Sequence, residues 1–565
     1  MSTSNFLLVS IIVSLIGFTF GDGFALTYSI GPEQPYENIG DVPWESLSAG
    51  DSILIHYQNS AYHEKWVICR AGTDSAPIVV TGIPNEEGKL PVIDGRDATT
   101  RSQLNFWNEQ RGVIKIGGAN NPPDILPRYI VIENLDIRSG RPPYSFTGRD
   151  GSTDYVNNCA AIYIEKGEHI IIRDCILHDC GNGLFCGNLT TDLVVENNYI
   201  YDNGIEGSGD EHNNYTEAYG ILFQFNHFGA LRTNCDGDNL KDRSAGCIIR
   251  YNWIENGNRQ LDLDESDAEE WYSDSKYRKT FVYGNILLEG EGEGNSQIIH
   301  YGGDCGDESK YRKGTLYLYN NTIVSTRSGN TTLVRLSTND ESCDARNNII
   351  YAASSGAHLA MIDDAGTISL RNNWLKTGWV NSHSPGSETV NDFGNLEGTA
   401  PGFSGFGTQN FSLAESSPCI NGGASLPNEV LPAHLPSMQY IRHCMSEPRP
   451  SDNTLDIGAY EYLKAQGVEE AYLLDDYTLS CYPNPFNTNT TISFDLPHAT
   501  KVTITIYDIL GKKVKELMLE PKLAGHHTIS WDSRNYNDEP ISAGLYFSRM
   551  ETDEFTRVIK LILVK

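Results

Sequence analysis

The segment Leu316-Tyr317-Leu318-Tyr319-Asn320-Asn321 is followed by Asp344-Ala345-Arg346-Asn347-Asn348 and then by Leu370-Arg371-Asn372-Asn373. Each segment is short, leads into a pair of asparagines and precedes a further apolar run. The last asparagines of the three units are 27 and 25 residues apart. A period of this size in short strands predicts a solenoid of parallel β-strands, in which each coil buries its apolar side against its neighbours.

The same pattern recurs upstream, where β-branched runs lead into Asn or Asp at 130–134, 170–174, 194–198, 248–252 and 281–285. The longer intervals there indicate loops inserted into a fixed frame. Asparagines at one turn of every coil tolerate the left-handed backbone conformation and can hydrogen-bond along the stack. A leucine-rich repeat is excluded because its Leu consensus is absent, and a sandwich or a propeller is the minor alternative.

Composition limits the possible functions. The 565 residues include 42 Lys+Arg and 74 Asp+Glu, which gives a net charge of −32. This balance argues against a nucleic-acid-binding protein, which needs a basic face. A hydrophobic content of 39% is enough to form buried cores and argues against general disorder.

The N-terminal residues resemble a targeting segment. Residues 6–20 are almost uninterrupted apolar sequence, and Gly23-Phe24-Ala25 supplies small residues at the positions that signal peptidase reads. We therefore predict that residues 1–25 are a removed secretory signal. The alternative is an uncleaved anchor, but the run is shorter than the roughly 20 residues that span a bilayer. No later run is comparable, so we expect no transmembrane segment in the mature chain.

Twelve cysteines fit an oxidising destination. Their positions suggest two candidate disulfides, Cys305–Cys343 and Cys419–Cys444. Cys175 and Cys186 occupy apolar segments, and we expect them to be buried as small hydrophobic side chains. The spacing of the cysteines does not match a structural zinc site.

The repeat ends near Ser417-Pro418-Cys419-Ile420-Asn421-Gly422-Gly423 and Asp456-Ile457-Gly458-Ala459-Tyr460-Glu461-Tyr462. These residues resemble the closing segment of secreted right-handed β-helix proteins, which commonly finish on an SPxIxxG and DIGAYE pattern. The resemblance covers about residues 26–462. It implies an all-β fold with a right-handed parallel β-helix domain over that range, and it specifies fold better than activity.

A different domain follows a polar, acidic linker at 463–476. Residues 477–565 contain alternating strands such as Thr491-Ile492-Ser493-Phe494, which predict a small antiparallel β-sandwich. The motifs YPNPF, IYDILGKKV and SAGLYF resemble the C-terminal sorting domain of type IX secretion substrates. This resemblance implies handling by the type IX secretion machinery and a secreted or cell-surface protein. The alternative is an accessory sandwich that binds glycan or acts as a spacer.

The chemistry is expected on an outward face of the solenoid. If Leu261 and Leu263 point inward, Asp262 and Asp264 point outward, and alternating carboxylates of this kind can share a hard cation or a proton. We expect one face of successive coils to carry these two together with Gln224, Asn226, His300 and Arg335. The alternative is a solvated acidic surface.

The longest insertion precedes that face and includes 211–220 and 239–246. In it, Lys241 and Arg243 flank Asp242 immediately before a strand, so both can lean over one end of a cleft. In an acidic chain, such local cations are informative. The alternative is a surface ion pair with Asp242, which contributes little energetically.

These residues resemble the sites of β-helix polysaccharide lyases, the class of pectate lyases, alginate lyases and chondroitinase B. The resemblance implies β-elimination on an acidic, uronate-containing polysaccharide, with Lys241 as base and Arg243 as partner of the sugar carboxylate or leaving oxygen. It implies calcium held by Asp262, Asp264 and Glu217, with His212 and His300 as reserve acid/base groups. The expected substrate-binding residues are Gln224, Asn226, Arg259, Arg335, Tyr215, Trp253, Trp271 and Tyr272.

Three other functions compete with the lyase. A β-helix glycoside hydrolase would use Asp262 and Asp264 as acid and base. A C5 epimerase would use nearly the same site as a lyase. A non-catalytic adhesin would stack sugars on the aromatic residues. We expect a monomer in each case.

Overall fold

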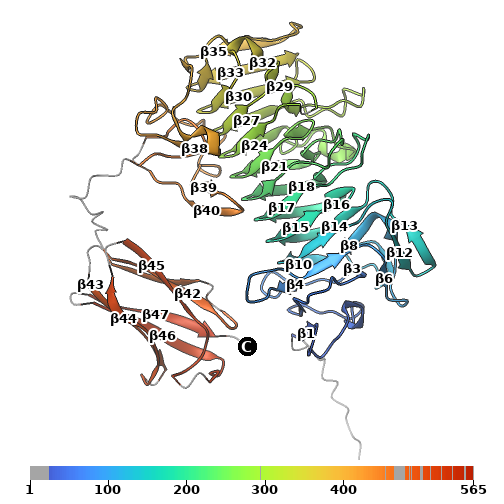
Figure 1. The fold of residues 1–565 in the computed structure, drawn as a ribbon, viewed down its shortest axis with the longest axis vertical. Helices are drawn as coiled ribbons and strands as arrows, with labels where there is room; N and C mark the ends of the chain where they lie inside the picture. The colour runs from blue at the N-terminus through green and yellow to red at the C-terminus, as the bar shows by residue number, and fades with distance from the viewer. Residues whose placement is uncertain are drawn as a thin grey trace, which may run out of the picture. The chain divides into compact units, whose positions relative to one another are not determined.

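The computed structural model describes residues 25–292, 294–451, 454–463, 477–482, 484, 486–496, 500–509, 511–522, 525–536, 539–552 and 555–563. The chain divides into two compact units, Met1–Leu463 and Lys464–Lys565 (Figure 1). The predicted signal segment lies outside the described residues except for Ala25, and the predicted linker does so except for Leu463. Among the described residues, no helix has both the length and the apolar character needed to cross a bilayer.

The first unit is a parallel β-helix whose strands stack rung upon rung (Figure 1). Each full coil contributes to three stacks. Stack one contains β1 (Thr27–Ile30), β2 (Ser52–His56), β4 (Ile78–Ile83), β10 (Arg128–Glu133), the second halves of β14 (Ala160–Arg173), β16 (Asn182–Glu196) and β18 (Asn214–Gln224), then β21 (Ala245–Arg250), β24 (Lys279–Tyr283), β27 (Thr315–Tyr319), β30 (Ser342–Arg346), β33 (Thr367–Arg371) and β35 (Thr389–Asp392).

Stack two contains β5 (Val92–Asp94), β11 (Asp136–Arg138), β15 (Ile176–His178), β17 (Tyr199–Tyr201), β19 (His227–Phe228), β22 (Trp253–Glu255), β25 (Ile286–Glu289), β28 (Thr322–Ser325), β31 (Ile349–Ala352), β34 (Trp374–Lys376) and β36 (Leu396–Gly398). Stack three contains β3 (Glu64–Ile68), β8 (Gly112–Ile116), the first halves of β14 (Ala160–Arg173), β16 (Asn182–Glu196) and β18 (Asn214–Gln224), then β20 (Leu240–Asp242), β23 (Leu261–Leu263), β26 (Gln297–Tyr301), β29 (Thr331–Leu336) and β32 (Leu359–Asp364).

Short elements decorate this frame. They are the strands β6 (Ala98–Thr100), β7 (Asn105–Phe106), β9 (Ala119–Asn121), β12 (Ser145–Gly148), β13 (Gly151–Asp154), β37 (Phe403–Gly405), β38 (Asn410–Leu413), β39 (Met438–Ile441) and β40 (Met445–Pro448), and the single-turn 3₁₀ helices η1 (Ile39–Asp41), η2 (Glu109–Arg111), η3 (Glu269–Trp271), η4 (Gly356–His358) and η5 (Phe406–Thr408).

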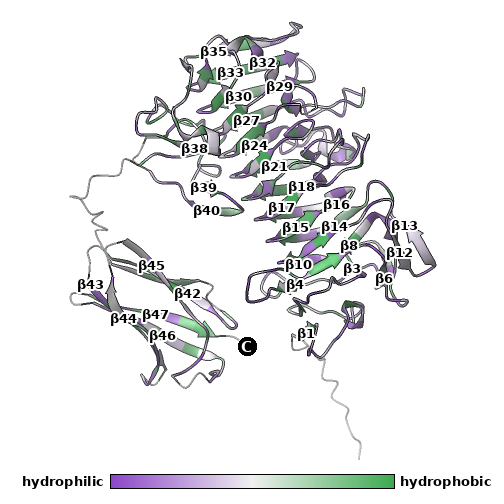
Figure 2. Ribbon diagram, viewed as in Figure 1, coloured by the Kyte–Doolittle hydropathy of each residue, from purple (hydrophilic) through white to green (hydrophobic). Residues whose placement is uncertain are grey.

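The core lies between the three stacks and follows from the alternation of the strands. Ile170 and Ile172 are fully buried, whereas Ile171 between them is only partly covered. Figure 2 shows the hydrophobic residues concentrated on the stacked strands and the hydrophilic ones in the connecting loops. Because alternate side chains of a strand point to opposite faces, each coil supplies apolar groups inward and functional groups outward.

An asparagine ladder runs along the turn between stacks one and two. In each coil the side-chain amide donates to the Oδ1 atom of the next asparagine at 3.0 Å, through Asn198, Asn226, Asn252, Asn285, Asn321, Asn348, Asn373 and Asn395. The preceding residue, such as Asn320 or Asn347, takes the left-handed conformation at φ 51° or 54°. One residue therefore forms the turn and the next forms the ladder, which explains the paired asparagines of the repeat.

The closing segment covers the side of stack two. Phe411 and Tyr440 pack against Trp253, and the DIGAYE residues return to the ladder, where the Gly458 amide donates to the Asn347 carbonyl at 2.7 Å. Gly458 has φ 106°, and a Cβ there would lie 2.7 Å from Ile349 Cδ1, so this close approach requires glycine. The closing segment therefore covers the apolar side of stack two.

The second unit is an antiparallel β-sandwich, as the alternating strands predict. One sheet contains β41 (Thr478–Tyr482), β42 (Thr490–Leu496) and β45 (Gly525–Trp531), and the other contains β44 (Lys513–Lys522), β43 (Thr500–Asp508), β46 (Gly544–Glu551) and β47 (Thr556–Leu563). Inward residues such as Phe494, Ile504 and Trp531 form its core. The fold class is therefore all-β throughout: a parallel β-helix followed by a small sandwich.

The predicted disulfides are not formed, because all twelve cysteines are free. Cys343 is buried whereas Cys305 is exposed, and the thiols of Cys419 and Cys444 donate to different carbonyls, those of Pro401 and Asn198. The structure therefore corrects both pairings. Cys175 and Cys186 are buried, and burial raises the pKa of both thiols, as expected of inert core side chains.

Replacement of a central rung tests the ladder. Asn285→Ala removes a donor and an acceptor and leaves the Asn252 amide and the Ile249 carbonyl without their partner. We expect the free energy of unfolding, measured by urea titration, to fall by about 1–3 kcal/mol. Asn428→Ala changes an exposed asparagine and should stay within about 0.5 kcal/mol of the parent. Equal losses in the two variants would contradict a structural role for the ladder.

Candidate active site

Stack three carries one continuous outward ladder of polar and aromatic side chains. The register pairs Tyr215 with Lys241, Lys241 with Asp262, Asp262 with His300, and His300 with Arg335. These residues alternate with buried apolar neighbours such as those at 240, 261 and 263. The register agrees with the expected alignment of Asp262, His300 and Arg335 on successive coils, and it adds Lys241 and Tyr215 to the same wall.

The Lys241 ammonium lies between two carboxylates. It contacts Asp262 Oδ2 and lies 2.8 Å from Asp264 Oδ2, and its side chain is only 13% exposed. Burial lowers the pKa of Lys241, but the charges of Asp262 and Asp264 outweigh it and hold the pKa well above the usual range. Lys241 is therefore held as an ammonium. This corrects the expectation of a neutral lysine base, which needs a lowered pKa.

Asp262 is held from two other sides. His300 Nδ1 lies 2.7 Å from Asp262 Oδ1, and His300 Nε2 lies 2.8 Å from the Ser337 hydroxyl. Because a carboxylate only accepts, His300 donates a hydrogen bond from Nδ1 to Asp262. Burial raises the pKa of Asp262, but Lys241 and the His300 hydrogen bond hold it well below the usual range. His300 is fully buried, so it orients Asp262 and is not itself an exposed acid or base.

The neighbouring carboxyl, Asp238, has a pKa shifted in the opposite direction. Burial and the charge of Asp262 raise the pKa of Asp238 well above its usual range. The two carboxyls of the pocket therefore differ in their tendency to hold a proton. A protonated acid next to an ionised carboxylate is the arrangement that acid–base catalysis uses.

His212 lies beside this pair as a neutral ring. Its Nδ1 accepts the Asp238 backbone N–H at 2.9 Å, so its remaining nitrogen, Nε2, carries the proton. Burial, followed by the charge of Lys241, lowers the pKa of His212 to about 3. The single lone pair of the ring is thus occupied, and His212 can donate a hydrogen bond but cannot remove a proton from a substrate.

These side chains face a pocket of about 730 Å³. Five of the expected site residues line it, namely His212, Tyr215, Lys241, Arg259 and Asp262. Five loop segments complete the walls with Val156, Asn157, Asn158, Gly209, Asp210, Glu211, Asp236, Asp238, Asn258 and Asp304. A concave, polar site with groups of perturbed pKa is the default candidate for an active site.

Two local devices fix the strands at the pocket. At their start, the Asn239 amide donates to the Glu255 carbonyl at 2.7 Å and accepts from Asn213, a short second asparagine ladder. At their end, the fully buried Arg312 donates to the backbone carbonyls of Asp242, Ser244 and Asp264 at 2.8–2.9 Å. Arg312 is distant in sequence from these partners, and no local sequence pattern predicts this role.

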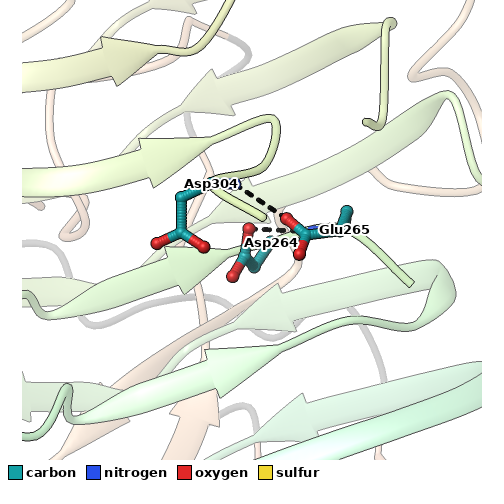
Figure 3. A group of neighbouring side chains, drawn as sticks. All are labelled: Asp264, Glu265 and Asp304. Carbon is teal, nitrogen blue, oxygen red and sulfur yellow. Dashed lines mark hydrogen bonds between the residues drawn. The ribbon is translucent and has the colours of Figure 1, made fainter. Parts of the chain in front are cut away.

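A group of three carboxyls lies next to Lys241. Oxygens of Asp264, Glu265 and Asp304 all lie within 4.8 Å of one another (Figure 3). Asp264 accepts the Glu265 backbone N–H, and Glu265 Oε2 accepts the Asp304 N–H at 2.8 Å. Burial, followed by the hydrogen bond and charge of Asp264, raises the pKa of Glu265 to about 7. Backbone N–H groups and the Lys241 ammonium therefore already bind oxygens of Asp264 and Glu265.

The expected calcium site does not assemble. Asp262 and Asp264 both bind the Lys241 ammonium. Glu217 instead accepts the Ser266 hydroxyl at 2.6 Å and the Asp267 N–H at 2.7 Å, and lies 3.7 Å from Arg243. Among the described residues, the only group of three potential ligands within reach of one ion is the Asp264 group, which excludes Glu217. The donor set thus does not fit calcium at the expected place.

Several other expected site residues serve the fold. Gln224 bonds Glu196 and Arg250 in stack one, because β18 turns a corner and only its first half joins the pocket wall. Asn226 is a rung of the asparagine ladder. Both assignments to the pocket face are corrected.

The aromatic expectations are corrected as well. Trp253 lies in stack two under Phe411 and Tyr440 and is 1% exposed, so it cannot stack on a sugar in the pocket. Trp271 packs against Tyr277 around η3, and the Tyr272 hydroxyl donates to the Ser266 carbonyl. Arg243 bonds the Glu265 carbonyl and Asp267 beside the pocket, and Arg335 pairs with Asp364. None of these residues lines the pocket.

Sequence reasoning missed Asp238 and Glu211, which lie in the long insertions before the wall strands. Their position in the sequence is the signal that could have found them. The insertions end just before Tyr215 and Lys241, so Glu211, four residues before Tyr215, and Asp238, three residues before Lys241, reach the same pocket.

Comparison with known proteins identifies the second unit. Residues 480–565 match the model of the secretion system C-terminal sorting domain. This confirms the type IX sorting domain predicted from the YPNPF, IYDILGKKV and SAGLYF motifs, and it implies a secreted or cell-surface protein. None of the curated proteins compared with the chain matches it.

Solved structures resemble the first unit only weakly. Lacto-N-biosidase of family GH136 from Eubacterium ramulus has 12% identity and a TM-score of 0.41, over 66% of this chain and 68% of that one. Pectin methylesterase from Aspergillus niger has 11% identity and a TM-score of 0.24, over 66% and 86%. DFA-IIIase from Arthrobacter chlorophenolicus A6 has 10% identity and a TM-score of 0.24, over 62% and 77%. Similarity at this level says nothing about activity.

Removal of the Lys241 charge tests the electrostatics of the site. The pKa of Asp264 is about 2, below its ordinary 3.8, so in the parent this carboxylate stabilises the fold above about pH 4 and loses that effect as the pH falls towards 2. In Lys241→Met the two buried carboxylates lose the ammonium that they share, and their pKa values should rise.

We therefore expect Lys241→Met to lose about 3–5 kcal/mol at neutral pH. Its melting temperature should rise as the pH falls from 7 to 5, where the parent changes little. Lys89→Met, at an exposed lysine, is the control. Parallel pH profiles of melting temperature for the parent and Lys241→Met would refute the charge arrangement.

Proposed function

We propose that the β-helix unit is a secreted glycoside hydrolase whose reaction takes place at Asp238 and Asp262. The observation that carries this proposal is a pair of carboxyls on one pocket whose pKa values are shifted in opposite directions: the pKa of Asp238 is raised and that of Asp262 is lowered. Both side chains line the same pocket. Environments that push the pKa values of paired carboxyls apart assign the acid and the base.

In the proposed reaction, Asp238 donates its proton to the glycosidic oxygen, and the C1–O bond breaks. A water molecule attacks C1 and loses a proton to the Asp262 carboxylate, so that one proton is delivered and one is taken up. Lys241 and His300 keep Asp262 ionised and oriented. General acid–base catalysis of this kind contributes roughly 10²–10⁴-fold to the rate.

The two carboxyls reach the pocket from different elements. Asp238 follows Gly237 in an insertion loop, whereas Asp262 lies in the central strand β23. The Arg259 NH1 atom lies 4.0 Å from Asp238 Oδ1 and 3.5 Å from Asp262 Oδ1, so one guanidinium group lies near both carboxyls. Hydrolases hold their two carboxyls about 5 Å apart when they retain the configuration at C1 and about 6.5–9.5 Å apart when they invert it.

The lyase alternative lacks a base. β-Elimination requires a group that removes the C5 proton of a uronic acid. Lys241 is held as an ammonium, the His212 lone pair is occupied, and the carboxylates around Arg243 keep its pKa above an already high usual value despite burial. A C5 epimerase meets the same obstacle. Of the enzymatic alternatives considered, hydrolysis by two carboxyls has the best support.

The products identify the reaction. Incubation with a panel of neutral and acidic polysaccharides should generate new reducing ends without the ultraviolet chromophore of an unsaturated sugar. Chromophore formation would establish elimination instead, and binding without cleavage of any polymer would establish an adhesin.

Two variants test the assigned roles. Asp238→Asn and Asp262→Asn should each lower kcat by at least about a hundredfold, with Asp150→Asn, at an exposed aspartate, as the control. The parent needs Asp238 protonated and Asp262 ionised, so its activity should extend above the ordinary carboxyl range before it falls at alkaline pH. Retention of that alkaline limb in Asp238→Asn would contradict the acid assignment.

A further inference from the structure

The two cations of the pocket are already paired. Lys241 lies between Asp262 and Asp264, and an Arg259 NH group lies 3.5 Å from Asp262 and 4.0 Å from Asp238. These contacts balance the positive charge on the floor of the pocket. A substrate carboxylate would have to displace one of them.

The remaining carboxylates of the pocket have no such partner. Asp210, Glu211, Asp236 and Asp304 line the walls, and none of them forms an ion pair with any residue in the described parts of the chain. The pocket therefore carries an excess of negative charge. Three of these side chains are exposed to solvent, whereas Glu211 is only 4% exposed.

Glu211 is the informative member of this set. Its Oε2 atom is buried and has no hydrogen-bond partner, although the side chain belongs to the pocket wall. Burial raises the pKa of the Glu211 carboxyl, and a hydrogen bond from the Ser208 side chain to this carboxyl acts against the rise. Folded proteins rarely leave a buried acceptor unsatisfied, so an open acceptor on a pocket wall points to a donor supplied by a ligand.

We infer that the pocket binds a sugar residue that carries a positively charged amine, with Glu211 as the partner of the ammonium. This inference rests on the proposed function, because it names the class of glycan that the hydrolase accepts. A neutral hydroxyl would satisfy one hydrogen bond but not the excess charge, and a uronate would be repelled by the walls. A charge-assisted bond to a buried carboxylate satisfies both requirements.

A bare divalent cation fits the same wall less well. Among the residues that the structure describes, the group of three ligands close enough to hold one ion contains Asp264, Glu265 and Asp304 and leaves out Glu211. An ammonium needs only one carboxylate at hydrogen-bonding distance and tolerates more distant charges around it.

Binding to three matched oligosaccharides tests the inference. Isothermal titration calorimetry of the full chain should use a glucosamine tetramer, the N-acetylglucosamine tetramer and a galacturonate tetramer at slightly acidic pH, where the amine is charged. We expect the glucosamine tetramer to bind at least about tenfold more tightly than the other two. Added salt should weaken its binding most.

The variant Glu211→Gln assigns the preference to one side chain. It should lose about tenfold in affinity for the glucosamine tetramer and leave the affinity for the N-acetylated tetramer unchanged. Glu206→Gln, at an exposed position in the same loop, is the matched control and should keep the parent's preference. Melting curves establish that both variants are folded.

Three outcomes overturn the inference. They are equal or weaker binding of the glucosamine tetramer, no binding of it at all, and retention of the preference in Glu211→Gln. The proposed hydrolase is judged separately, since loss of cleavage in Asp262→Asn on any polymer supports it whichever sugar is preferred. Cleavage of neutral glycans that depends on Asp262, without preferential binding of the glucosamine tetramer, would support the proposed hydrolase and contradict the inferred amine preference.

Discussion

The pairing of β20 with β23 places Lys241 directly beside Asp262, and the remaining features of the site depend on this contact. The ammonium lowers the pKa of Asp262 against the effect of burial, burial and the charge of Asp262 raise the pKa of Asp238, and burial and the charge of Lys241 lower the pKa of His212. Burying a pair of charges usually brings little net stability, because desolvation cancels the attraction. In the function that we propose, this buried network prepares two carboxyls for acid–base chemistry.

The solenoid itself could be predicted because its signals are local and repeated. Paired asparagines such as Asn320-Asn321 recur at every coil, one for the turn and one for the ladder. The alignment of Asp262, His300 and Arg335 was accessible for the same reason, since each lies in a short strand with an apolar neighbour on both sides. The sandwich was recognisable from strand alternation, and its sorting role from three short motifs spaced along the domain.

The rest of the site depends on information that a single sequence does not display. β18 is 11 residues long and serves two stacks, so its apolar pattern does not reveal which half faces the pocket, and Gln224 was placed on the wrong wall. The charge state of Lys241 is decided by carboxylates in the neighbouring coil and in the loop before it, not by burial alone. Asp238 and Glu211 lie in insertions, where no periodicity relates position to direction. Arg312 acts from 48 residues beyond Asp264.

Lys241 is held as an ammonium between two carboxylates, and nuclear magnetic resonance can observe its protonation directly. Side-chain ¹⁵N and ¹³C signals of labelled lysine, followed from neutral to alkaline pH and assigned with Lys241→Arg, report the protonation of each amine. Our account predicts that the Lys241 signal shows no deprotonation until the pH exceeds the ordinary lysine range. A Lys241 signal that titrates near neutral pH would contradict the account and restore this residue as a candidate base.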